Sequence, residues 1–357
     1  MTEPDYRKCF LEADLCYPGS MDETELWVEK YRPKKFDEIV GQDAIVARLR
    51  SYAETKNLPH LLFAGPAGTG KTTCSIVLAR ELFGEYWREN FMELNASDER
   101  GIRVVRGDPE HNVPSKIKSF ARTAPLGGAS FKLIFLDESD ALTSDAQSAL
   151  RRTMELYSRN CRFVFSANYP GKIIDPIQSR CAVFQFSPLR DADIQKCVEN
   201  IVKAEELNIT REAVDYIIRY SRGDSRRAIN TLQASAFLSK SIDQNTVYLA
   251  TSTPDPREIK QMFDYSLEGS FLRARDILDT LLFERGMSAT DLIAEIHRTV
   301  FDLELSEDAL LDIVSRIGET EYRIVQGGND RIQLESLLAQ IGLIGKREKK
   351  ALKQKLI

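Results

Sequence analysis

The feature that most limits how this chain can fold is the segment 65-GPAGTGKT-72, which fits the pattern G-x-x-x-x-G-K-T. It follows an apolar run at residues 61–64 and precedes a helix that the sequence predicts over residues 73–83. Glycines let consecutive backbone N–H groups turn toward a phosphate, and the helix N-terminus adds a partial positive charge. In such a loop Lys71 would reach the β- and γ-phosphates and the hydroxyl of Thr72 would bind Mg²⁺. The segment therefore predicts a nucleotide-binding α/β domain.

Four short apolar runs with the character of buried strands alternate with helix-like stretches between residues 27 and 187; they are residues 61–63, 91–94, 132–136 and 162–166. Strands that alternate with helices form crossover units, which build a parallel sheet covered on both faces. After Pro188 the apolar residues recur at helical spacing, and a turn-rich break at residues 253–256 divides the helical part in two. We therefore expect an α/β domain, a small helical domain and a second helical domain.

Two acidic residues, Asp137 and Glu138, end the predicted strand at 132–136. Ligands bind at the carboxyl ends of the strands in a parallel α/β sheet, so Asp137 can face the phosphate loop. Asp137 would then support Mg²⁺, and Glu138 would orient or activate the attacking water. The alternative is that these acids only cap a following helix. Asn168 ends the next predicted strand, where its amide could bond a γ-phosphate or a water, or could simply form a turn.

The formal net charge of −5, taken as a sum, argues against a protein that coats nucleic acid. The charge is unevenly distributed, however. Residues 1–26 contain seven acidic and two basic side chains, so this extension accounts for the whole excess. Near the other end, residues 346–355 contain six basic side chains and one acidic one. The total charge therefore does not decide whether the chain binds DNA.

Six cysteines are present without a C-x-x-C pair or the spacing of a small disulfide framework. We expect them to be thiols in a reducing compartment rather than metal ligands. The N-terminus lacks the basic-then-apolar layout of a signal peptide, and no apolar run approaches the ~18 residues of a membrane-spanning helix. The expectation is an intracellular protein with no membrane partner.

Several motifs follow one another in a distinctive order: Trp27-Val28-Glu29-Lys30-Tyr31-Arg32-Pro33, Val40-Gly41-Gln42, the phosphate loop, Asn95-Ala96-Ser97-Asp98, Asp137-Glu138-Ser139-Asp140, Ser179-Arg180-Cys181 and 223-GDSRRAIN-230. Together they resemble the small subunits of replication factor C, the clamp loader of the AAA+ ATPase family. The resemblance covers residues 27–345. The lead-in 127-GGASFK-132 is more similar to archaeal members than to eukaryotic ones.

The resemblance implies how this chain would bind ATP and Mg²⁺. Lys71 and Thr72 would bind the phosphates and the metal, Asp137 would support the metal, and Glu138 would be the catalytic base. The full set of implied ATP contacts, with the adenine held by the first five, is Val28, Tyr31, Arg32, Pro33, Val40, Gly65, Pro66, Ala67, Gly68, Thr69, Gly70, Lys71, Thr72, Thr73, Asn168 and Arg226.

Further catalytic roles are implied for three residues outside the phosphate loop. Asn168 matches the first sensor residue of the family and Arg226 the second, although the adjacent Arg227 could serve instead of Arg226. Arg180 matches the arginine finger, which reaches the ATP of a neighbouring subunit. A guanidinium at the γ-phosphate neutralises charge in the transition state, so a finger supplied in trans makes hydrolysis depend on assembly. The alternative for Arg180 is a surface ion pair.

A helix is expected after the acidic pair, because Ser144 and Gln147 fit a capping box. Its apolar stripe, which includes Leu150, would face the sheet, while Arg151 and Arg152 lie off that stripe. In the family this helix faces DNA and the adjacent subunit. One of the two arginines is therefore expected to couple the site to DNA, with Arg151 as the chosen candidate and solvated surface charge as the alternative.

DNA contacts are also expected from residues 100–122, which hold six basic and two acidic side chains. Basic residues can bind phosphates without reading bases, as a loader that acts at any primer–template junction requires. In the family this region lines the chamber around the duplex, and the candidates are Arg100, Arg103, Arg106 and Lys116. The sequence departs from the family at Arg103, where an acidic residue is usual, and at an insertion over residues 107–115.

The expected organisation is an acidic extension at 1–26, an AAA+ α/β ATPase domain at 27–187, a helical lid at 188–252, a helical collar for oligomerisation at 253–345 and a basic tail at 346–357. We expect an ATPase subunit that opens a sliding clamp of the proliferating cell nuclear antigen type and loads it onto primer–template DNA. Its partners would be a large subunit and several small subunits, as a pentamer. It would work in the nucleoid-associated cytoplasm of an archaeon or in the nucleus of a eukaryote.

Two alternatives belong to other functional classes. One is a scaffold subunit that binds ATP without hydrolysing it, which the presence of Lys71, Asp137, Glu138 and Arg180 disfavours. The other is a different AAA+ motor, such as a protein unfoldase or a branch-migration helicase. Unfoldases need an aromatic-apolar-glycine pore loop, and the corresponding stretch at residues 100–103 reads Arg-Gly-Ile-Arg.

Overall fold

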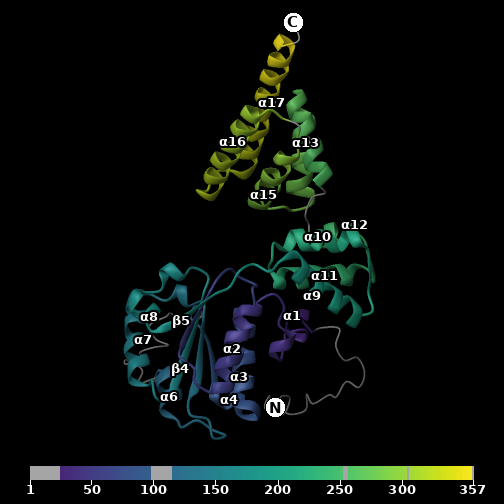
Figure 1. The fold of residues 1–357 in the computed structure, drawn as a ribbon. Coiled ribbons are helices and arrows are strands. Elements are labelled where there is room, and N and C mark those ends of the chain that lie inside the picture. Colours follow the sequence, from purple (N-terminus) through teal and green to yellow (C-terminus); the bar gives the residue numbers. More distant parts are fainter. Residues whose placement is uncertain (1–24, 98–114, 252–255, 304, 356–357) are drawn as a thin grey trace, which may run out of the picture. The chain divides into compact units, whose positions relative to one another are not determined.

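The computed structural model describes residues 25–97, 115–251, 256–303 and 305–355. They divide into two compact units, and the ribbon in Figure 1 follows the elements of each. The first unit contains the described chain up to Glu206 together with Ile217–Gln233. The second contains Leu207–Tyr216 together with the described chain from Ala234 onward. The domain boundaries predicted at residues 187 and 252 do not coincide with this division and stay predictions.

The first unit is built around a five-stranded parallel sheet with the order β2-β3-β4-β1-β5. Its strands are β1 (His60–Ala64), β2 (Phe91–Asn95), β3 (Lys132–Asp137), β4 (Cys161–Ala167) and β5 (Cys181–Gln185). The first four confirm the strands expected from the sequence. The sequence does not predict β5. This strand lies at the edge of the sheet with only Phe184 fully buried, so it lacks the continuous apolar run that marks the others.

Helices cover both faces of this sheet (Figure 1). On one face lie α2 (Asp43–Thr55), α3 (Lys71–Phe83) and α4 (Trp87–Asn90), and on the other lie α6 (Lys116–Arg122), α7 (Ser144–Leu156) and α8 (Asp175–Gln178). Successive side chains of a strand point to opposite faces. Leu61 and Phe63 accordingly pack with α2 and α3 in one core cluster, and Leu62 packs with α7 in the other. The expected fold class, a parallel sheet buried on both faces, is confirmed.

The predicted N-cap of α7 is wrong by one residue. Thr143, not Ser144, caps the helix, because the Thr143 hydroxyl accepts a hydrogen bond from the Ala146 backbone N–H at 3.3 Å. The Gln147 side chain is buried and bonds the backbone of Leu142, Lys172 and Ile174 instead of reaching back to the cap. Two adjacent hydroxyl residues make the cap ambiguous in the sequence. The predicted stripe is confirmed, with Ala146, Leu150 and Met154 fully buried.

The chain after β5 is largely helical, as the sequence predicts. The next helices are α9 (Asp191–Ala204), α10 (Arg211–Ser221), α11 (Ser225–Leu238) and α12 (Gln244–Thr251). One parallel pair of two-residue strands, β6 (Asn208–Ile209) and β7 (Ser241–Ile242), was not expected. Segments this short carry no periodic pattern from which a strand could be predicted.

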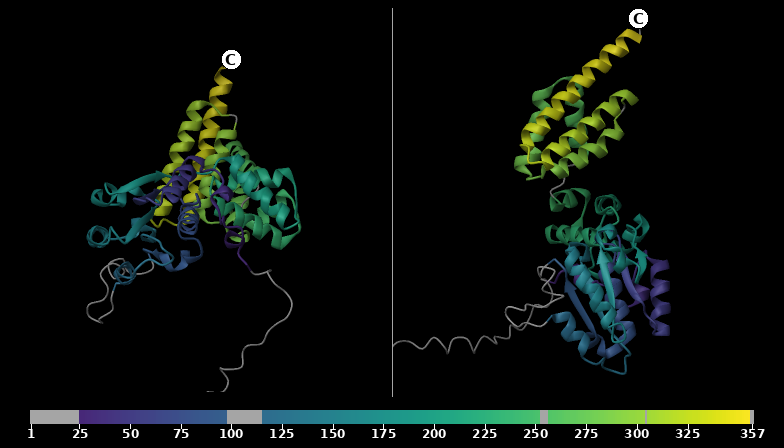
Figure 2. Two further views of the ribbon diagram at one scale, coloured as in Figure 1. Left: turned by 60° about the horizontal axis from the view of Figure 1, so that its bottom comes forward. Right: turned by 90° about the vertical axis from the view of Figure 1, so that its left-hand side faces the viewer.

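The C-terminal part of the second unit is a helical bundle with its own core. Its helices are α13 (Pro256–Glu268), α14 (Phe271–Asp279), α15 (Ala289–Thr299), α16 (Glu307–Val325) and α17 (Asp330–Lys355), and Figure 2 shows α17 extending beyond the helices it packs against. Leu278, Leu281, Leu334, Leu337 and Leu338 are all buried in one cluster. The apolar stripes of these helices therefore serve mainly as the core of the bundle itself. Most of the turn predicted at 253–256 lies outside the described residues.

The remaining elements are short. They comprise one turn of helix, α1 (Trp27–Lys30), a π-helical turn at Thr280–Glu284 and 3₁₀ turns at Phe36–Glu38, Gly84–Tyr86, Ser139–Ala141, Pro170–Lys172 and Val300–Asp302. Within the described residues, none of the helices combines the length and the apolar character needed to cross a membrane.

The burial of α7 generates a stability prediction. Truncating the fully buried Leu150 to alanine removes its packing in the core and leaves a cavity, so Leu150→Ala should lower the free energy of unfolding by about 2–5 kcal/mol. Chemical denaturation followed by circular dichroism would measure the loss. The matched control is Leu156→Ala in the same helix, where the side chain is 72% exposed and the change should be within about 0.5 kcal/mol. Equal losses in the two variants would contradict the assigned facing of α7.

Candidate functional site

The phosphate loop leaves the sheet at the carboxyl end of β1 and runs directly into α3. Gly65 follows the last strand residue, its N–H donates to the carbonyl of Ala167 at 3.1 Å, and the helix begins at Lys71. Gly68 has a φ of +67°, and a Cβ there would lie 1.7 Å from Asp224 Oδ1. The left-handed backbone therefore favours glycine at position 68, and a Cβ there would also force the Asp224 side chain to move.

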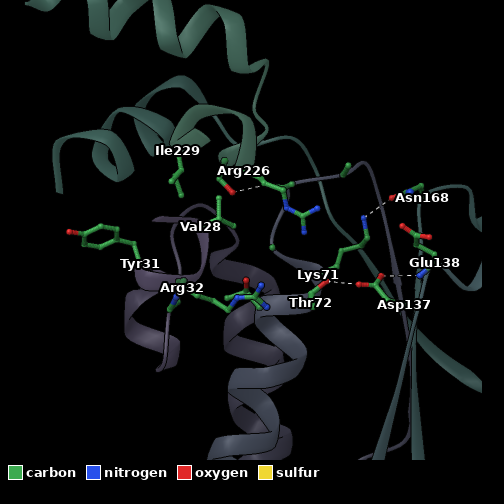
Figure 3. Close-up of a pocket in the computed structure, with 16 residues that line it drawn as sticks. Val28, Tyr31, Arg32, Lys71, Thr72, Asp137, Glu138, Asn168, Arg226 and Ile229 are labelled. Atoms are coloured by element: carbon green, nitrogen blue, oxygen red, sulfur yellow. Dashed lines mark hydrogen bonds between the residues drawn. The ribbon is translucent and has the colours of Figure 1, made fainter. Parts of the chain in front are cut away.

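Lys71 is buried at the base of this loop, with 7% of its surface exposed. Its Nζ donates to the carbonyls of Gly65 (2.7 Å) and Pro66 (2.8 Å) and to Asn168 Oδ1 (3.0 Å), as Figure 3 shows for Asn168. Burial lowers the pKa of Lys71, and the nearby carboxylates of Asp137 and Asp140 offset part of that effect. The structure thus brings together two residues that the sequence places 97 positions apart.

Thr72 and Asp137, the two residues expected to bind Mg²⁺, face each other across the loop. The Thr72 hydroxyl donates to Asp137 Oδ2 at 2.8 Å, and the Glu138 backbone N–H donates to Asp137 Oδ1 at 2.9 Å. A hydroxyl and a carboxylate at one point form an oxygen donor set of the kind that Mg²⁺ prefers, so the residues present fit this ion. Glu138 adopts a left-handed φ of +51°, and its side chain is exposed at the cleft.

Asp140 is a residue of this region to which the sequence analysis assigns no role. Its carboxylate accepts hydrogen bonds from the backbone N–H groups of Asn168 (3.4 Å) and Tyr169 (3.2 Å). These contacts hold the turn after β4 and thereby the amide that bonds Lys71. The only signal in the sequence is that Asp140 is the third acid in the segment 137–140, which does not reveal its partner.

A cleft of about 140 Å³ is lined by Lys71, Thr72, Asp137, Glu138 and Asn168, together with Val28, Tyr31, Arg32, Pro33, Ala67, Gly68, Gly70, Thr73, Ser225, Arg226 and Ile229. A larger cavity of about 610 Å³ adjoins it and shares Tyr31, Arg32 and Pro33. Val40 and Thr69 line the larger cavity, whereas Gly65 and Pro66 contribute the carbonyls that bind Lys71. The expected ATP contacts therefore surround two connected cavities, one polar and centred on Lys71 and the other bordered by apolar side chains such as Ile39, Leu189 and Ile201.

Helix α11 forms another wall of the cleft. Arg226, at its first turn, lines the cleft and extends toward the phosphate loop (Figure 3). Arg227 instead lies over the ring of Tyr220, with its guanidinium carbon 5.6 Å from the ring centre. The geometry therefore favours Arg226 over Arg227 as the residue that faces a nucleotide. The sequence analysis misses Ser225 and Ile229, although Ile229 follows Arg226 by three positions and so shares its helix face.

Ser225 links α11 to the phosphate loop directly. Its hydroxyl and its backbone N–H both donate to the carbonyl of Gly68, at 2.8 and 3.1 Å. The first turn of α11, which carries Arg226, is therefore fixed to the loop that would surround the phosphates.

Arg180 does not line the cleft of its own chain. Its guanidinium donates to the Pro176 carbonyl (2.7 Å) and to Glu155 Oε1 (2.8 Å), and 41% of the side chain is exposed. Arg151 lies 3.8 Å from the same Glu155 oxygen. An exposed guanidinium outside the cleft agrees with both readings of the sequence, a surface ion pair and a finger directed at another chain.

The residues expected to contact DNA are only partly described. Arg100, Arg103 and Arg106 and nearly all of the 107–115 insertion lie outside the described residues. Lys116 is exposed at the first position of α6, and Ser115 caps that helix by accepting from the Lys118 N–H at 3.3 Å.

Within the described ranges, no group of three or more His, Cys, Asp or Glu side chains could hold a metal ion. Cys74, Cys161, Cys181 and Cys197 are free thiols, and Cys9 and Cys16 lie outside the described residues.

Comparison with known families agrees with this geometry. A model of the AAA family, the ATPases associated with various cellular activities, matches residues 61–189. The replication factor C C-terminal domain matches residues 254–340, and the P-loop domain of the Holliday junction DNA helicase RuvB matches residues 31–89. Among solved structures, a RuvB variant from Thermotoga maritima is similar with a TM-score of 0.50 and 20% identity, covering 75% of this chain and 89% of that one. At this identity the likeness shows the fold alone.

Two archaeal relatives match over almost their full lengths. A replication factor C small subunit from Methanocella arvoryzae is 53% identical over 325 residues, covering 91% of this chain and 98% of the relative. A second one, from Archaeoglobus fulgidus, is 49% identical over 327 residues, covering 92% and 100%. Together with the two domain matches, these similarities show that the chain belongs to the family of replication factor C small subunits and is an AAA ATPase.

Proposed function

We propose that this protein is the small subunit of a clamp loader, in which ATP binding and hydrolysis open a ring-shaped sliding clamp and load it onto primer–template DNA. The observation that carries the proposal is that five polar groups of a complete hydrolytic site line one cleft, while Arg180 is exposed outside it. Those groups are Lys71, Thr72, Asp137, Glu138 and Asn168. A chain with this arrangement would hydrolyse ATP efficiently only beside a neighbouring copy, as a multi-subunit loader requires.

The phosphates of ATP would bind in the phosphate loop. Lys71 would donate to the β- and γ-phosphates, and backbone N–H groups of the loop would bind the β-phosphate. Thr72 and Asp137 would hold Mg²⁺, which when bound neutralises charge on the phosphate oxygens. Glu138, exposed at the cleft, would orient the attacking water and accept its proton, and Asn168 would bond that water or the γ-phosphate.

The base would lie at the opposite end of the connected cavities. Val28, Tyr31, Arg32 and Pro33 line that end. The larger cavity beyond them is bordered in part by apolar side chains, which suit a purine. Arg226 lies between the two ends, where its guanidinium could contact the phosphates.

DNA would be bound through phosphates. Arg100, Arg103, Arg106 and Lys116 supply the basic side chains, and such contacts do not depend on base sequence. Arg151 would couple DNA to hydrolysis, a role supported by its position 3.8 Å from the Glu155 oxygen that also pairs with Arg180. With archaeal relatives, the proposed location is the nucleoid-associated cytoplasm.

The proposal is tested by reconstituting the chain with a large subunit from the same organism and measuring ATP hydrolysis. Clamp and primed DNA together should strongly stimulate ATP turnover by the complex. Unprimed DNA should stimulate turnover less, and the isolated chain should hydrolyse ATP more slowly than the stimulated complex. Turnover that neither the clamp nor primed DNA stimulates would contradict clamp loading. ATP-dependent strand separation by the purified chain would instead support a helicase, the class to which the RuvB P-loop match on residues 31–89 points.

The role of Glu138 predicts a separation of binding from hydrolysis. Glu138→Gln removes the proton acceptor but keeps the shape of the side chain, so turnover of the assembled complex should fall by about 10²–10⁴-fold. The dissociation constant for ATP, measured by calorimetry, should change little. The matched control is Glu54→Gln, the same chemical change on the exposed surface of α2, which should leave turnover intact. Unchanged turnover in Glu138→Gln would favour the scaffold alternative.

The trans role of Arg180 predicts a defect that appears only in the assembly. Arg180→Ala should leave ATP binding by the isolated chain unchanged, because the side chain lies outside that cleft. In the reconstituted complex it should lower turnover by about 10³-fold or more. Arg50→Ala is the control, since Arg50 is equally exposed and also paired with a single carboxylate, that of Asp37. Normal turnover in complexes built with Arg180→Ala would show that Arg180 forms only a surface ion pair.

A further inference from the structure

One wall of the nucleotide cleft is formed by a segment that cannot hold its own shape. Residues 25–33, the wall segment, contain the single helical turn α1 and none of the turn's residues is buried. A four-residue helix closes too few hydrogen bonds to be stable alone. Val28, Tyr31, Arg32 and Pro33 nevertheless line the cleft. Their positions must therefore be set by contacts that the wall segment makes with other elements.

The start of the wall segment is held by one buried amide. Gln233 of α11 has 6% of its surface exposed, and both halves of its side-chain amide are used. Its Oε1 accepts from the Trp27 backbone N–H at 3.1 Å, and its Nε2 donates to the Glu25 carbonyl at 3.0 Å. A buried amide bonded in this way fixes the backbone of the segment in one register, because removing it leaves both backbone groups without this partner.

The other end of the helical turn is held by a carboxylate that follows α9. Glu205 Oε1 accepts from the Tyr31 hydroxyl at 2.5 Å and from Lys30 Nζ at 2.8 Å. Burial, together with the bond to Glu205, raises the pKa of Tyr31 to about 12. The hydroxyl therefore keeps its proton and remains a donor throughout the physiological range.

The two anchors belong to elements that also shape the cleft. Arg226, Ile229 and Gln233 are separated by three and four positions, so they lie on one face of α11. Arg226 and Ile229 line the cleft, and Figure 3 shows Ile229 and Val28 pointing toward each other. One helix face thus carries a phosphate-facing arginine, a side chain of the cleft wall and the amide that fixes the opposite wall.

We propose that Gln233 and Glu205 are positioning residues for the base of the nucleotide: they fix the wall segment, and through it they set the affinity for the base without affecting the affinity for the phosphates. This inference rests on the proposed function, which assigns this end of the cleft to the base. The phosphates bind at the other end, at Lys71 and the glycines of the loop, which neither anchor touches.

The test compares ADP with pyrophosphate, which has the same phosphate groups but no nucleoside. Calorimetry gives the dissociation constant of ADP for the purified full chain, and competition with ADP gives that of pyrophosphate, both with Mg²⁺. Gln233→Met keeps the side-chain length but removes the amide. It should raise the dissociation constant of ADP about tenfold and leave that of pyrophosphate within about twofold of the wild-type value. Tyr31→Phe, which removes only the hydroxyl, should also raise the dissociation constant of ADP.

Two comparisons separate positioning from general damage. Glu205→Gln keeps an oxygen that can accept from Tyr31, so it should retain ADP affinity that Glu205→Ala loses. Gln195→Met is the matched control. Gln195 lies on the exposed side of α9 and bonds only Glu199 among the contacts described, so this change should leave the dissociation constants of both ADP and pyrophosphate unchanged. If Gln233→Met lowers the melting temperature, Tyr31→Phe and the Glu205 pair still decide the question.

Equal weakening of ADP and pyrophosphate, or no change in either, would overturn the inference and leave clamp loading untouched. A wild-type chain that binds ADP no more tightly than pyrophosphate would overturn the assignment of the base, and the inference with it. Loss of clamp- and DNA-stimulated turnover is a separate measurement on the complex. Failure of the inference can therefore be distinguished from failure of clamp loading.

Discussion

The parallel register of β1, β3 and β4 is the constraint on which the site depends. Ala64 pairs with Ala167, so the residues that follow them, Gly65 and Asn168, leave the sheet side by side. Leu136 pairs with Phe165, which brings Asp137 to the same edge. Parallel strands end together only because helices carry the chain back between them, and those helices bury both faces of the sheet. Slipping one strand by a residue would exchange the side chains on its two faces and separate the loop from its partners.

At this edge the buried ammonium of Lys71 joins the parts of the site. Burying an ammonium is costly unless its protons are bonded, and here two loop carbonyls and the Asn168 amide accept them. A phosphate that enters the loop would compete for the same protons, so nucleotide binding would change how the turn after β4 is held. The Gly68 carbonyl, bonded twice by Ser225, connects the same loop to α11. The site is therefore joined both to the sheet and to the helix that bears Arg226.

The sequence predicts those parts of this arrangement that depend on local pattern. Apolar runs predict four strands, and the spacing of glycines, Lys71 and Thr72 predicts the loop, because each signal lies within a few residues. The edge strand β5 escapes prediction because its residues are half-exposed, and the cap of α7 because Thr143 and Ser144 are chemically equivalent. Asp140, Glu205 and Gln233 carry no signal in the sequence that reveals their partners. Each acts on residues 28 or more positions away, up to 208 for Gln233, and a single polar side chain does not reveal so distant a partner.

We propose that the cleft of one chain binds ATP and that Arg180 of a neighbouring chain completes it. The most direct measurement is a cryo-electron microscopy structure of the assembled complex with clamp, primed DNA and a non-hydrolysable ATP analogue. We expect the γ-phosphate to lie at Lys71 and Thr72 and the Arg180 guanidinium of the adjacent subunit to lie within hydrogen-bonding distance of it. Finding Arg180 still paired with Glu155 of its own chain and remote from every nucleotide would contradict the claim.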